Sequence, residues 1–237
     1  AQGFSHGVMN TDNMSILGLT IDYGPYSFME TYDPNFICNH SDTQGRYSFE
    51  RQPSVALWNL HRLADSLKNL IKEDQLKEAL SMYEKTLVKE YSLLMRNKFG
   101  FVLQDEGDDT LINNFLELLY LHKKDYHQSI RLLSNDDENS LGEAFEPWFK
   151  DYRKRLKKET EGLNQRRTLM NGVNPKYILR NYLAEVAIRK AEDHSEYDEI
   201  DVLFKLLRDP FEEHEGHESY DSKTPEWAQN LELSCSS

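Results

Sequence analysis

Cysteine, basic side chains and long apolar runs are all scarce in this sequence. Two cysteines among 237 residues permit one bridge at most, so the fold does not depend on a disulfide framework, and they suit a reducing compartment. No segment approaches the ~18 consecutive apolar residues that a membrane span needs, and the first residues lack the charged and apolar regions of a secretion signal. We therefore expect a protein without a membrane partner.

The charge balance is strongly acidic. Lys and Arg number 28 against 41 Asp and Glu, which gives a net charge of −13. Sequence-independent binding of nucleic acid relies on many basic contacts to phosphate, so we do not expect nucleic acid as a partner. The one basic run that stands out, residues 153–158, is flanked by acids and is predicted to lie on a solvated helix face.

The length fits one large domain or two small ones. The chain starts at Ala1 without an initiator Met and enters a motif-dense stretch at once. We therefore expect an excised fragment with a missing upstream partner. A bacterial protein of this kind would be cytoplasmic, and a eukaryotic one mitochondrial.

The first fifty residues differ in kind from the rest. They are rich in Gly, Asn, Asp, Tyr and Phe, which is typical of loops and short strands. Residues 14–21 form a β-leaning apolar segment that Gly18 divides, so we predict a short hairpin or a bulged strand pair there. From Pro53 onwards apolar residues recur at helical spacing. The fold class expected is mainly α with a small β-hairpin region near the N-terminus.

Helix periodicity and stop signals locate the later elements. A first helix is predicted from Pro53 to about Leu70, and a long second helix ends before Gly100. Further helices are predicted over residues 109–124, 126–133, 145–158, 175–193 and 196–208. Residues 211–237 are polar and are predicted to lie across the surface without forming a helix. These patterns suggest three regions, residues 1–52, 53–209 and 210–237.

Chemistry-bearing residues gather between His6 and Asp22. Asn13 is followed nine residues later by Asp22, and a hairpin between them would bring the two side chains together. Amide and carboxylate oxygens are the ligands that Mg²⁺ prefers, usually alongside substrate phosphates. Protein kinases use an Asn and Asp pair of this type, so the pattern indicates a Mg-nucleotide site. The alternative interpretation is that these residues are ordinary turn formers.

The loop departs from ordinary phosphotransfer chemistry at one position. His6, Gly7 and Asn13 have the spacing of the His-Gly-Asp…Asn loop of small-molecule phosphotransferases, but Val8 stands where the catalytic Asp should be. Asp12 is the nearest carboxylate able to replace it. A changed reaction is therefore a better hypothesis than kinase chemistry, and His6 is expected to brace the loop rather than to bind a metal.

Residues 6–18 (HGVMNTDNMSILG) and 22–25 (DYGP) resemble the selenoprotein O family of YdiU-like protein adenylyltransferases. The similarity continues through residues 36–42, 45–49, 52–53 and 57–60, and it returns at residues 174–183 and 234–237. It thus spans the chain and is densest over the first sixty residues.

The resemblance implies the C-lobe portion of a protein-kinase-like fold followed by family-specific C-terminal helices. It implies transfer of AMP from ATP to Ser, Thr or Tyr hydroxyls of proteins. Asp12 would accept the hydroxyl proton, while Asn13 and Asp22 would bind Mg²⁺, with Mn²⁺ as an alternative, and Asp22 would also lie close to the nucleotide. The expected partners are ATP, protein substrates and a missing N-terminal lobe, without which the fragment is expected to be inactive.

The resemblance also concerns Cys38 and Cys235. Free thiols would be the default for two cysteines in a chain of this type, but the matching pair in the family can form an intramolecular disulfide. Three alternatives to AMP transfer stay open: transfer of another nucleotide such as UMP, residual phosphotransfer, and a non-catalytic pseudokinase scaffold.

Overall fold

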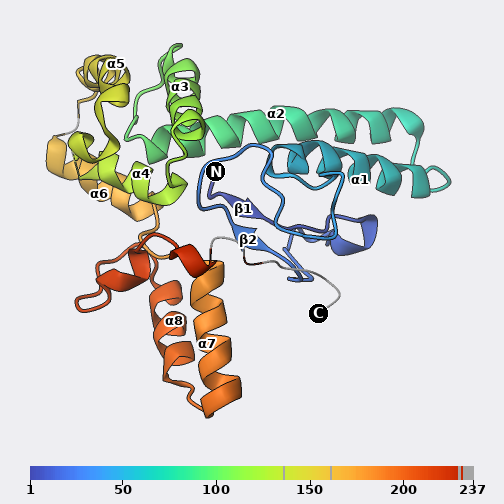
Figure 1. Cartoon of the computed structure of the whole chain (residues 1–237). Coiled ribbons are helices and arrows are strands. Elements are labelled where there is room, and N and C mark those ends of the chain that lie inside the picture. Colours follow the sequence, from blue (N-terminus) through green and yellow to red (C-terminus); the bar gives the residue numbers. More distant parts are fainter. Residues whose placement is uncertain (136, 161, 229–230, 232–237) are drawn as a thin grey trace. The chain divides into compact units, whose positions relative to one another are not determined.

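The computed structural model describes residues 1–135, 137–160, 162–228 and 231. In these residues, eight α-helices and one two-stranded sheet are the main regular elements, which confirms the predicted mainly α class (Figure 1). The strands are β1 (Phe4–Ser5) and β2 (Ser27–Phe28). The helices are α1 (Gln52–Ser66), α2 (Glu73–Lys98), α3 (Asp108–Leu121), α4 (Tyr126–Ser134), α5 (Glu146–Leu156), α6 (Leu163–Val173), α7 (Asn181–His194) and α8 (Asp198–Arg208).

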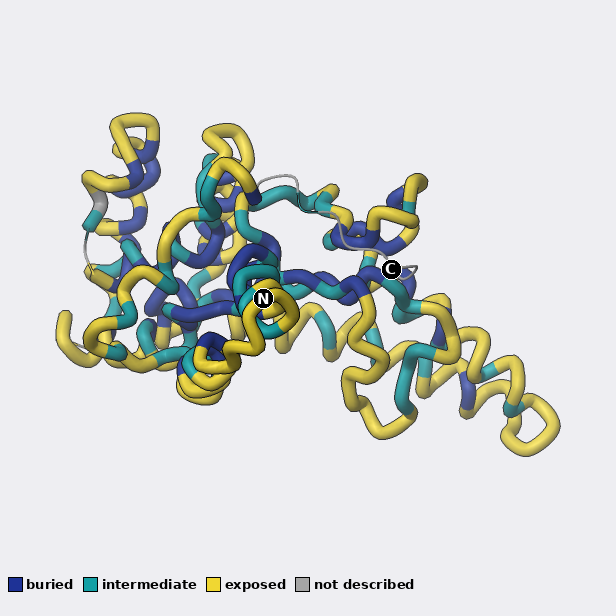
Figure 2. Tube along the Cα trace, turned by 60° about the horizontal axis from the view of Figure 1, so that its bottom comes forward, coloured by how far each residue is buried: buried dark blue, intermediate teal, exposed yellow. Residues whose placement is uncertain are grey.

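The chain divides into two compact units, each of which is described by itself. We call Phe4–Ser27 and Asp33–Ser92 the loop unit. We call Ala1–Gly3, Phe28–Tyr32 and Leu93–Leu231 the helical unit. In α8, for example, the buried positions Glu199, Leu203 and Leu206 recur with the helical period, and Figure 2 shows buried and exposed positions along the described trace. In the part of the chain that the structure describes, none of the helices is long and apolar enough to cross a membrane.

The long helix α2 ends as the sequence predicts. Its last residue is Lys98, and Gly100 follows with φ +74, a left-handed conformation that glycine adopts at little cost. The amide of Phe101 donates to the carbonyl of Arg96 at 2.9 Å and closes the last turn. A Cβ at Gly100 would lie 2.8 Å from Cγ of Arg166, so this glycine also permits close packing.

Two of the helix predictions in the C-terminal part are wrong. The sequence does not predict helix α6, because its residues are mostly polar and give no apolar stripe. In the structure, Met170 and Arg166 of this helix are nevertheless buried. The helix expected from Pro175 begins only at Asn181. The preceding segment is irregular, and the amide of Tyr177 donates to the carbonyl of Pro210 at 3.1 Å. Burial of its apolar residues therefore comes from tertiary contacts rather than from a helix face.

Aromatic rings form the core between α3 and α5. Phe115 lies with its ring centroid 5.3 Å from that of Phe99 and 4.5 Å from that of Trp148. Tyr152 stacks on Trp148 with a centroid separation of 4.8 Å, and its hydroxyl donates to the carbonyl of Phe99 at 2.9 Å. Such pairs contribute roughly 0.5–1.5 kcal/mol each beyond the area that they bury.

Arg155 corrects the prediction that residues 153–158 are solvated. Its side chain is 6% exposed, with Nε 2.5 Å from Asp108 Oδ1 and Nη1 2.6 Å from Glu159 Oε1. Its guanidinium also lies 4.4 Å from the ring centroid of Phe101. The other basic residues of the run are exposed, so the run has one buried basic side chain and the rest are solvated.

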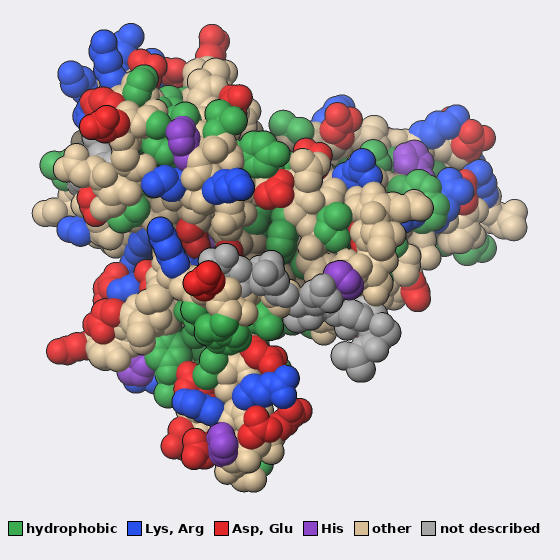
Figure 3. Space-filling view, viewed as in Figure 1, with side chains coloured by type: hydrophobic (Ala, Val, Ile, Leu, Met, Phe, Trp, Pro, Cys, Tyr) green, Lys and Arg blue, Asp and Glu red, His purple; other side chains and the backbone are tan. Residues whose placement is uncertain are grey.

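Acidic and basic side chains are interspersed on the face of the molecule that Figure 3 shows.

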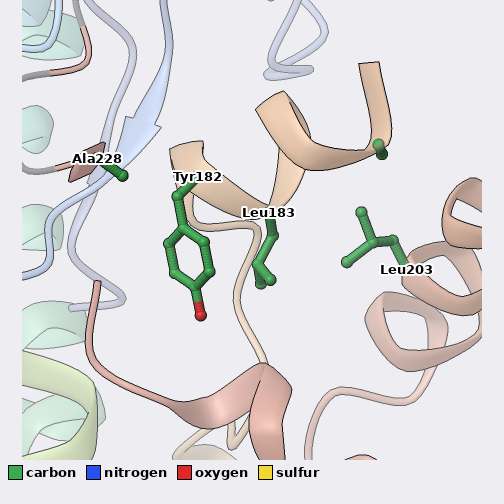
Figure 4. Close-up of a cluster of buried hydrophobic side chains, with 5 residues drawn as sticks. Tyr182, Leu183, Leu203 and Ala228 are labelled. Atoms are coloured by element: carbon green, nitrogen blue, oxygen red, sulfur yellow. The ribbon is translucent and has the colours of Figure 1, made fainter. Parts of the chain in front are cut away.

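Helices α7 and α8 pack through a small apolar cluster of their own. Figure 4 shows its members Tyr182, Leu183, Leu203 and Ala228, of which Ala228 comes from a short turn beyond α8. The described residues after α8 therefore return to cover this helix pair, without forming an α-helix, as predicted.

Arg180, immediately before α7, is surrounded by carboxylates. Its side chain is 1% exposed, and Nη1 lies 2.7 Å from Asp125 Oδ2 and 3.3 Å from Glu30 Oε2. Asp221 is held close by Gln128, whose side-chain amide donates to the main-chain carbonyl of Asp221. Burial and the charge of Asp125 raise the pKa of Asp221 to about 6, although Arg180 opposes this shift.

The raised pKa of Asp221 predicts a stability change with pH. The folded protein holds this proton more tightly than the unfolded chain, so the free energy of unfolding should fall as pH rises from about 4 to about 6 and then level off. Asp221→Asn removes the buried charge. At neutral pH we expect it to raise the free energy of unfolding by about 1–3 kcal/mol, with little difference from the natural chain near pH 4.

Urea denaturation over this pH range measures the effect. Asp74→Asn is the matched control, because Asp74 is exposed in the first turn of α2. Equal or lower stability of the Asp221→Asn chain at neutral pH would contradict the prediction.

Candidate catalytic and metal-binding loop

The residues predicted to carry the chemistry lie in the loop unit. A single 3-10 turn, Thr11–Asn13, holds two of them, and the amide of Asn13 closes that turn on the carbonyl of Asn10 at 3.1 Å. Asp12 is exposed in the turn, whereas Asn13 is half-buried. The turn therefore presents the carboxylate of Asp12 to solvent while the side chain of Asn13 faces the protein.

A short hairpin brings Asn13 and Asp22 together. Met14 and Thr20 form an antiparallel bridge, and Gly18 at the turn has φ +71. The side-chain amide of Asn13 donates to Oδ2 of Asp22, which itself has φ +57. The predicted hairpin and the predicted proximity of these two side chains are thus both present in the structure.

This pair has the donor chemistry of a magnesium site. Oδ1 of Asn13 is buried and has no hydrogen-bond partner among the described residues, so an acceptor oxygen remains beside the Asp22 carboxylate. The described residues contain no cluster of three or more His, Cys, Asp or Glu side chains that could hold a metal by themselves. A cation at this pair would therefore complete its coordination with phosphate oxygens and water, as Mg²⁺ commonly does.

His6 braces the loop, as expected. The ring is 7% exposed, and Nε2 lies 2.8 Å from the carbonyl oxygen of Ile21, the residue before Asp22. The imidazole thus ties the start of the loop to the far end of the hairpin. Through this contact His6 is placed to hold the backbone next to Asp22.

Side-chain amides hold the loop backbone, and sequence reasoning assigned them no role. Asn39 donates to the carbonyl of Gly7 at 3.2 Å, and Gln52 and Asn59 contact the loop from α1. One signal could have revealed Asn59: it is a short polar residue on a helix stripe that is otherwise apolar. The loop carbonyl that it meets could not be read from the sequence.

Cys38 is a buried residue that contacts the candidate loop at Ser5 and approaches Gly7 closely. It is 7% exposed, and its thiol donates to the carbonyl of Ser5 at 3.4 Å. Burial raises the pKa of the thiol, and the hydrogen bond with Ser5 offsets this only in part. Cys235 lies outside the described residues, so the disulfide between the two stays a prediction.

Comparison with known proteins identifies relatives over the whole chain. The family described as "Protein adenylyltransferase SelO" matches residues 1–208. The curated protein named "Protein nucleotidyltransferase YdiU" from Pectobacterium carotovorum is 48% identical over 100% of this chain and 51% of its own length. Proteins of the same name from Enterobacter sp. and Pectobacterium atrosepticum are 47% and 46% identical. The chain spans about half the length of these relatives.

The close approach of Gly7 and Cys38 predicts that the loop tolerates no side chain at position 7. Gly7 has φ +80, and a Cβ there would lie 2.7 Å from Sγ of Cys38 and 3.0 Å from the carbonyl oxygen of Pro25. We expect Gly7→Ala to lower the free energy of unfolding by about 2–4 kcal/mol, from backbone strain plus overpacking.

Urea denaturation measures this loss, with Gly18→Ala as the matched control. Gly18 has a similar φ of +71, but a Cβ added there would have nothing within 4 Å. The control should lose only the strain of about 1–2 kcal/mol. Equal losses in the two variants would show that the contact with Cys38 does not limit the loop.

Proposed function

Since the chain belongs to the SelO family of protein adenylyltransferases, we propose that the full-length protein transfers AMP from ATP to Ser, Thr or Tyr hydroxyls of other proteins. The observation that carries this proposal is the pairing of Asn13 with Asp22 next to an exposed Asp12. The relatives named above are bacterial, and we propose the cytoplasm as the compartment.

Asp12 would be the proton acceptor. The hydroxyl oxygen of the target attacks the α-phosphorus of ATP, the bond from that phosphorus to the bridging oxygen breaks, and pyrophosphate leaves. The hydroxyl proton passes to the Asp12 carboxylate, which needs to be well placed rather than unusually basic. Exposure of Asp12 supports a macromolecular acceptor, because a side chain on a protein surface can reach it.

Asn13 and Asp22 would hold the metal ion. Their side chains are in contact, and Oδ1 of Asn13, which is buried and has no hydrogen-bond partner among the described residues, is an acceptor of the kind that a hard cation prefers. When bound, Mg²⁺ or Mn²⁺ neutralises charge on the phosphates and favours attack at phosphorus. His6 keeps Asp22 in register with the loop through the carbonyl of Ile21.

Val8 supports nucleotidyl transfer over phosphotransfer. A small-molecule phosphotransferase would carry its base at this position of the loop, and valine cannot accept a proton. A base at Asp12 instead implies a different placement of the acceptor relative to the nucleotide. UMP transfer is the second candidate, because the relatives' printed name, protein nucleotidyltransferase, leaves the nucleotide open.

Labelled nucleotides distinguish these reactions in the full-length protein. We expect label from the α-phosphate of ATP, and none from the γ-phosphate, to appear on protein substrates. Asp12→Asn and Asp22→Asn should each reduce labelling by roughly 10²-fold or more, because one removes the base and the other a metal ligand.

Asp74→Asn, an exposed carboxylate on α2, serves as the matched control and should label normally. Transfer from the γ-phosphate would assign phosphotransfer, and preferential labelling from UTP would assign UMP transfer. Full labelling by both site variants would contradict the proposed roles of Asp12 and Asp22 and would favour a non-catalytic scaffold.

The isolated 237-residue chain should bind Mg-ATP weakly and transfer no detectable AMP. It covers about half the length of its relatives, and positioning by the remainder, including the expected N-terminal lobe, supplies much of such catalysis. Calorimetric titration with Mg-ATP and the α-phosphate labelling assay test this, with the full-length protein as the reference. Robust labelling by the isolated chain would contradict the prediction.

A further inference from the structure

Two amide side chains project from one face of α1 towards the catalytic loop. Gln52 and Asn59 are seven residues apart, which is two helical turns or about 10 Å along the axis. Val55, one turn after Gln52, is buried on the same face. This face of α1 therefore combines an apolar contact with two groups that donate and accept hydrogen bonds.

Gln52 pairs with the start of the loop as a neighbouring strand would. Its Nε2 donates to the carbonyl of Phe4 at 3.0 Å, and its Oε1 accepts from the amide of His6 at 3.0 Å. One side chain thus satisfies a main-chain acceptor and a main-chain donor on either side of Ser5. The strand β1 is fixed on α1 by this pair of bonds.

Asn59 holds the other end of the loop. It is 4% exposed, and Nδ2 lies 2.9 Å from the carbonyl oxygen of Met9 and 3.4 Å from that of Asn10. The hydroxyl of Tyr47 donates to the side-chain Oδ1 of Asn10. Both the main chain and the side chain of Asn10 are therefore held by the protein.

Asn10 is the residue on which the catalytic turn depends. Its carbonyl accepts from the amide of Asn13 at 3.1 Å and so closes the turn that contains Asp12. Any rotation of the Asn10 peptide group would move Asp12 and Asn13 together. The contact with Asn59 constrains this rotation from the loop's buried side.

Keeping an asparagine at position 59 has a cost. Its Oδ1 is buried and has no hydrogen-bond partner within the described ranges. An unpaired buried acceptor is destabilising, whereas leucine would suit the apolar stripe of α1. The amide therefore contributes through the hydrogen bonds that its Nδ2 donates to the carbonyls of Met9 and Asn10.

We propose that Asn59 is a positioning residue that fixes the Asp12 turn through the carbonyls of Met9 and Asn10. This inference rests on the proposed function, in which Asp12 takes the proton. Displacement of the turn by a fraction of an ångström should slow the transfer step while leaving nucleotide binding nearly unchanged, because Asn59 contacts neither the proposed base nor the metal pair.

The test uses Asn59→Asp and Asn59→Leu in the full-length protein. Asn59→Asp keeps the shape of the side chain but replaces the donor with a carboxylate that faces carbonyl oxygens. We expect kcat for AMP transfer to fall roughly ten- to a hundred-fold in both variants, with KM for ATP within about two-fold of the natural protein. Asn69→Asp and Asn69→Leu are the matched controls, because Asn69 is an exposed residue just after α1.

The pH profile separates positioning from a general loss of structure. Burial should raise the pKa of the carboxyl that Asn59→Asp introduces, and its protonated form can donate a hydrogen bond again. The activity of this variant relative to the natural protein should therefore be higher near pH 6 than near pH 8. Asn59→Leu, which cannot donate at any pH, should show a constant ratio.

Thermal unfolding and hydrogen exchange complete the experiment. We expect melting temperatures close to that of the natural protein for Asn59→Leu, and for Asn59→Asp at the low-pH end of the range where its carboxyl is protonated, with faster exchange in residues 6–13 in both. A kcat within two-fold of the natural value in both Asn59 variants, or a pH-independent ratio for Asn59→Asp, would overturn the proposal. If the natural protein transfers no AMP, the proposed function fails, and unchanged exchange in residues 6–13 would then overturn the role of Asn59 separately.

Discussion

Buried backbone that is neither helix nor extended sheet must find its hydrogen-bond partners elsewhere, and this constraint organises the loop unit. Residues 5–7 are buried, but the strand that contains Ser5 is only two residues long. The missing partners come from side-chain amides on later segments, among them Asn39 and Gln52. Because the same bonds satisfy the backbone and place the loop, stability and the geometry of the candidate site cannot be varied independently.

The helical unit meets the same requirement with guanidinium groups. Arg131 donates to the carbonyls of Asn171 and Asn174 at 3.1 and 2.7 Å, where α6 ends and the irregular segment begins. Arg180 lies at the end of that segment and pairs with Asp125 and Glu30. Arg131 is also paired with Glu213, so the carboxylates of this acidic chain include groups with structural partners as well as solvated ones.

The sequence predicts an element of secondary structure well where the signal lies within that element or next to it. The apolar period of α2 and the glycine after it predict that helix well, because both signals lie within a few residues of the structure that they describe. Helix α6 gives no such signal, since Arg166 and Met170 are buried by distant partners. Pro175 favours a helix start, although proline suits non-helical backbone equally well, and the structure is irregular there.

The site shows the same division between local and distant information. Asn13 and Asp22 can be paired from their spacing, because one short hairpin separates them. The partners of Asn59 lie 49 and 50 residues away, and no periodicity links a helix face to a loop carbonyl over that distance. Composition and motif therefore indicate candidate reacting groups, and only the folded structure identifies the groups that hold them.

The contact between Cys38 and Gly7 makes the loop sensitive to the size of one sulfur atom. The thiol fills the space that a methyl group at Gly7 would need, and it is enclosed on the other side by Ser5. An atom or group added to this thiol on the side of Gly7 would require the loop to move. Modification of Cys38 on that side would thus alter the candidate site through the volume that the added atoms occupy.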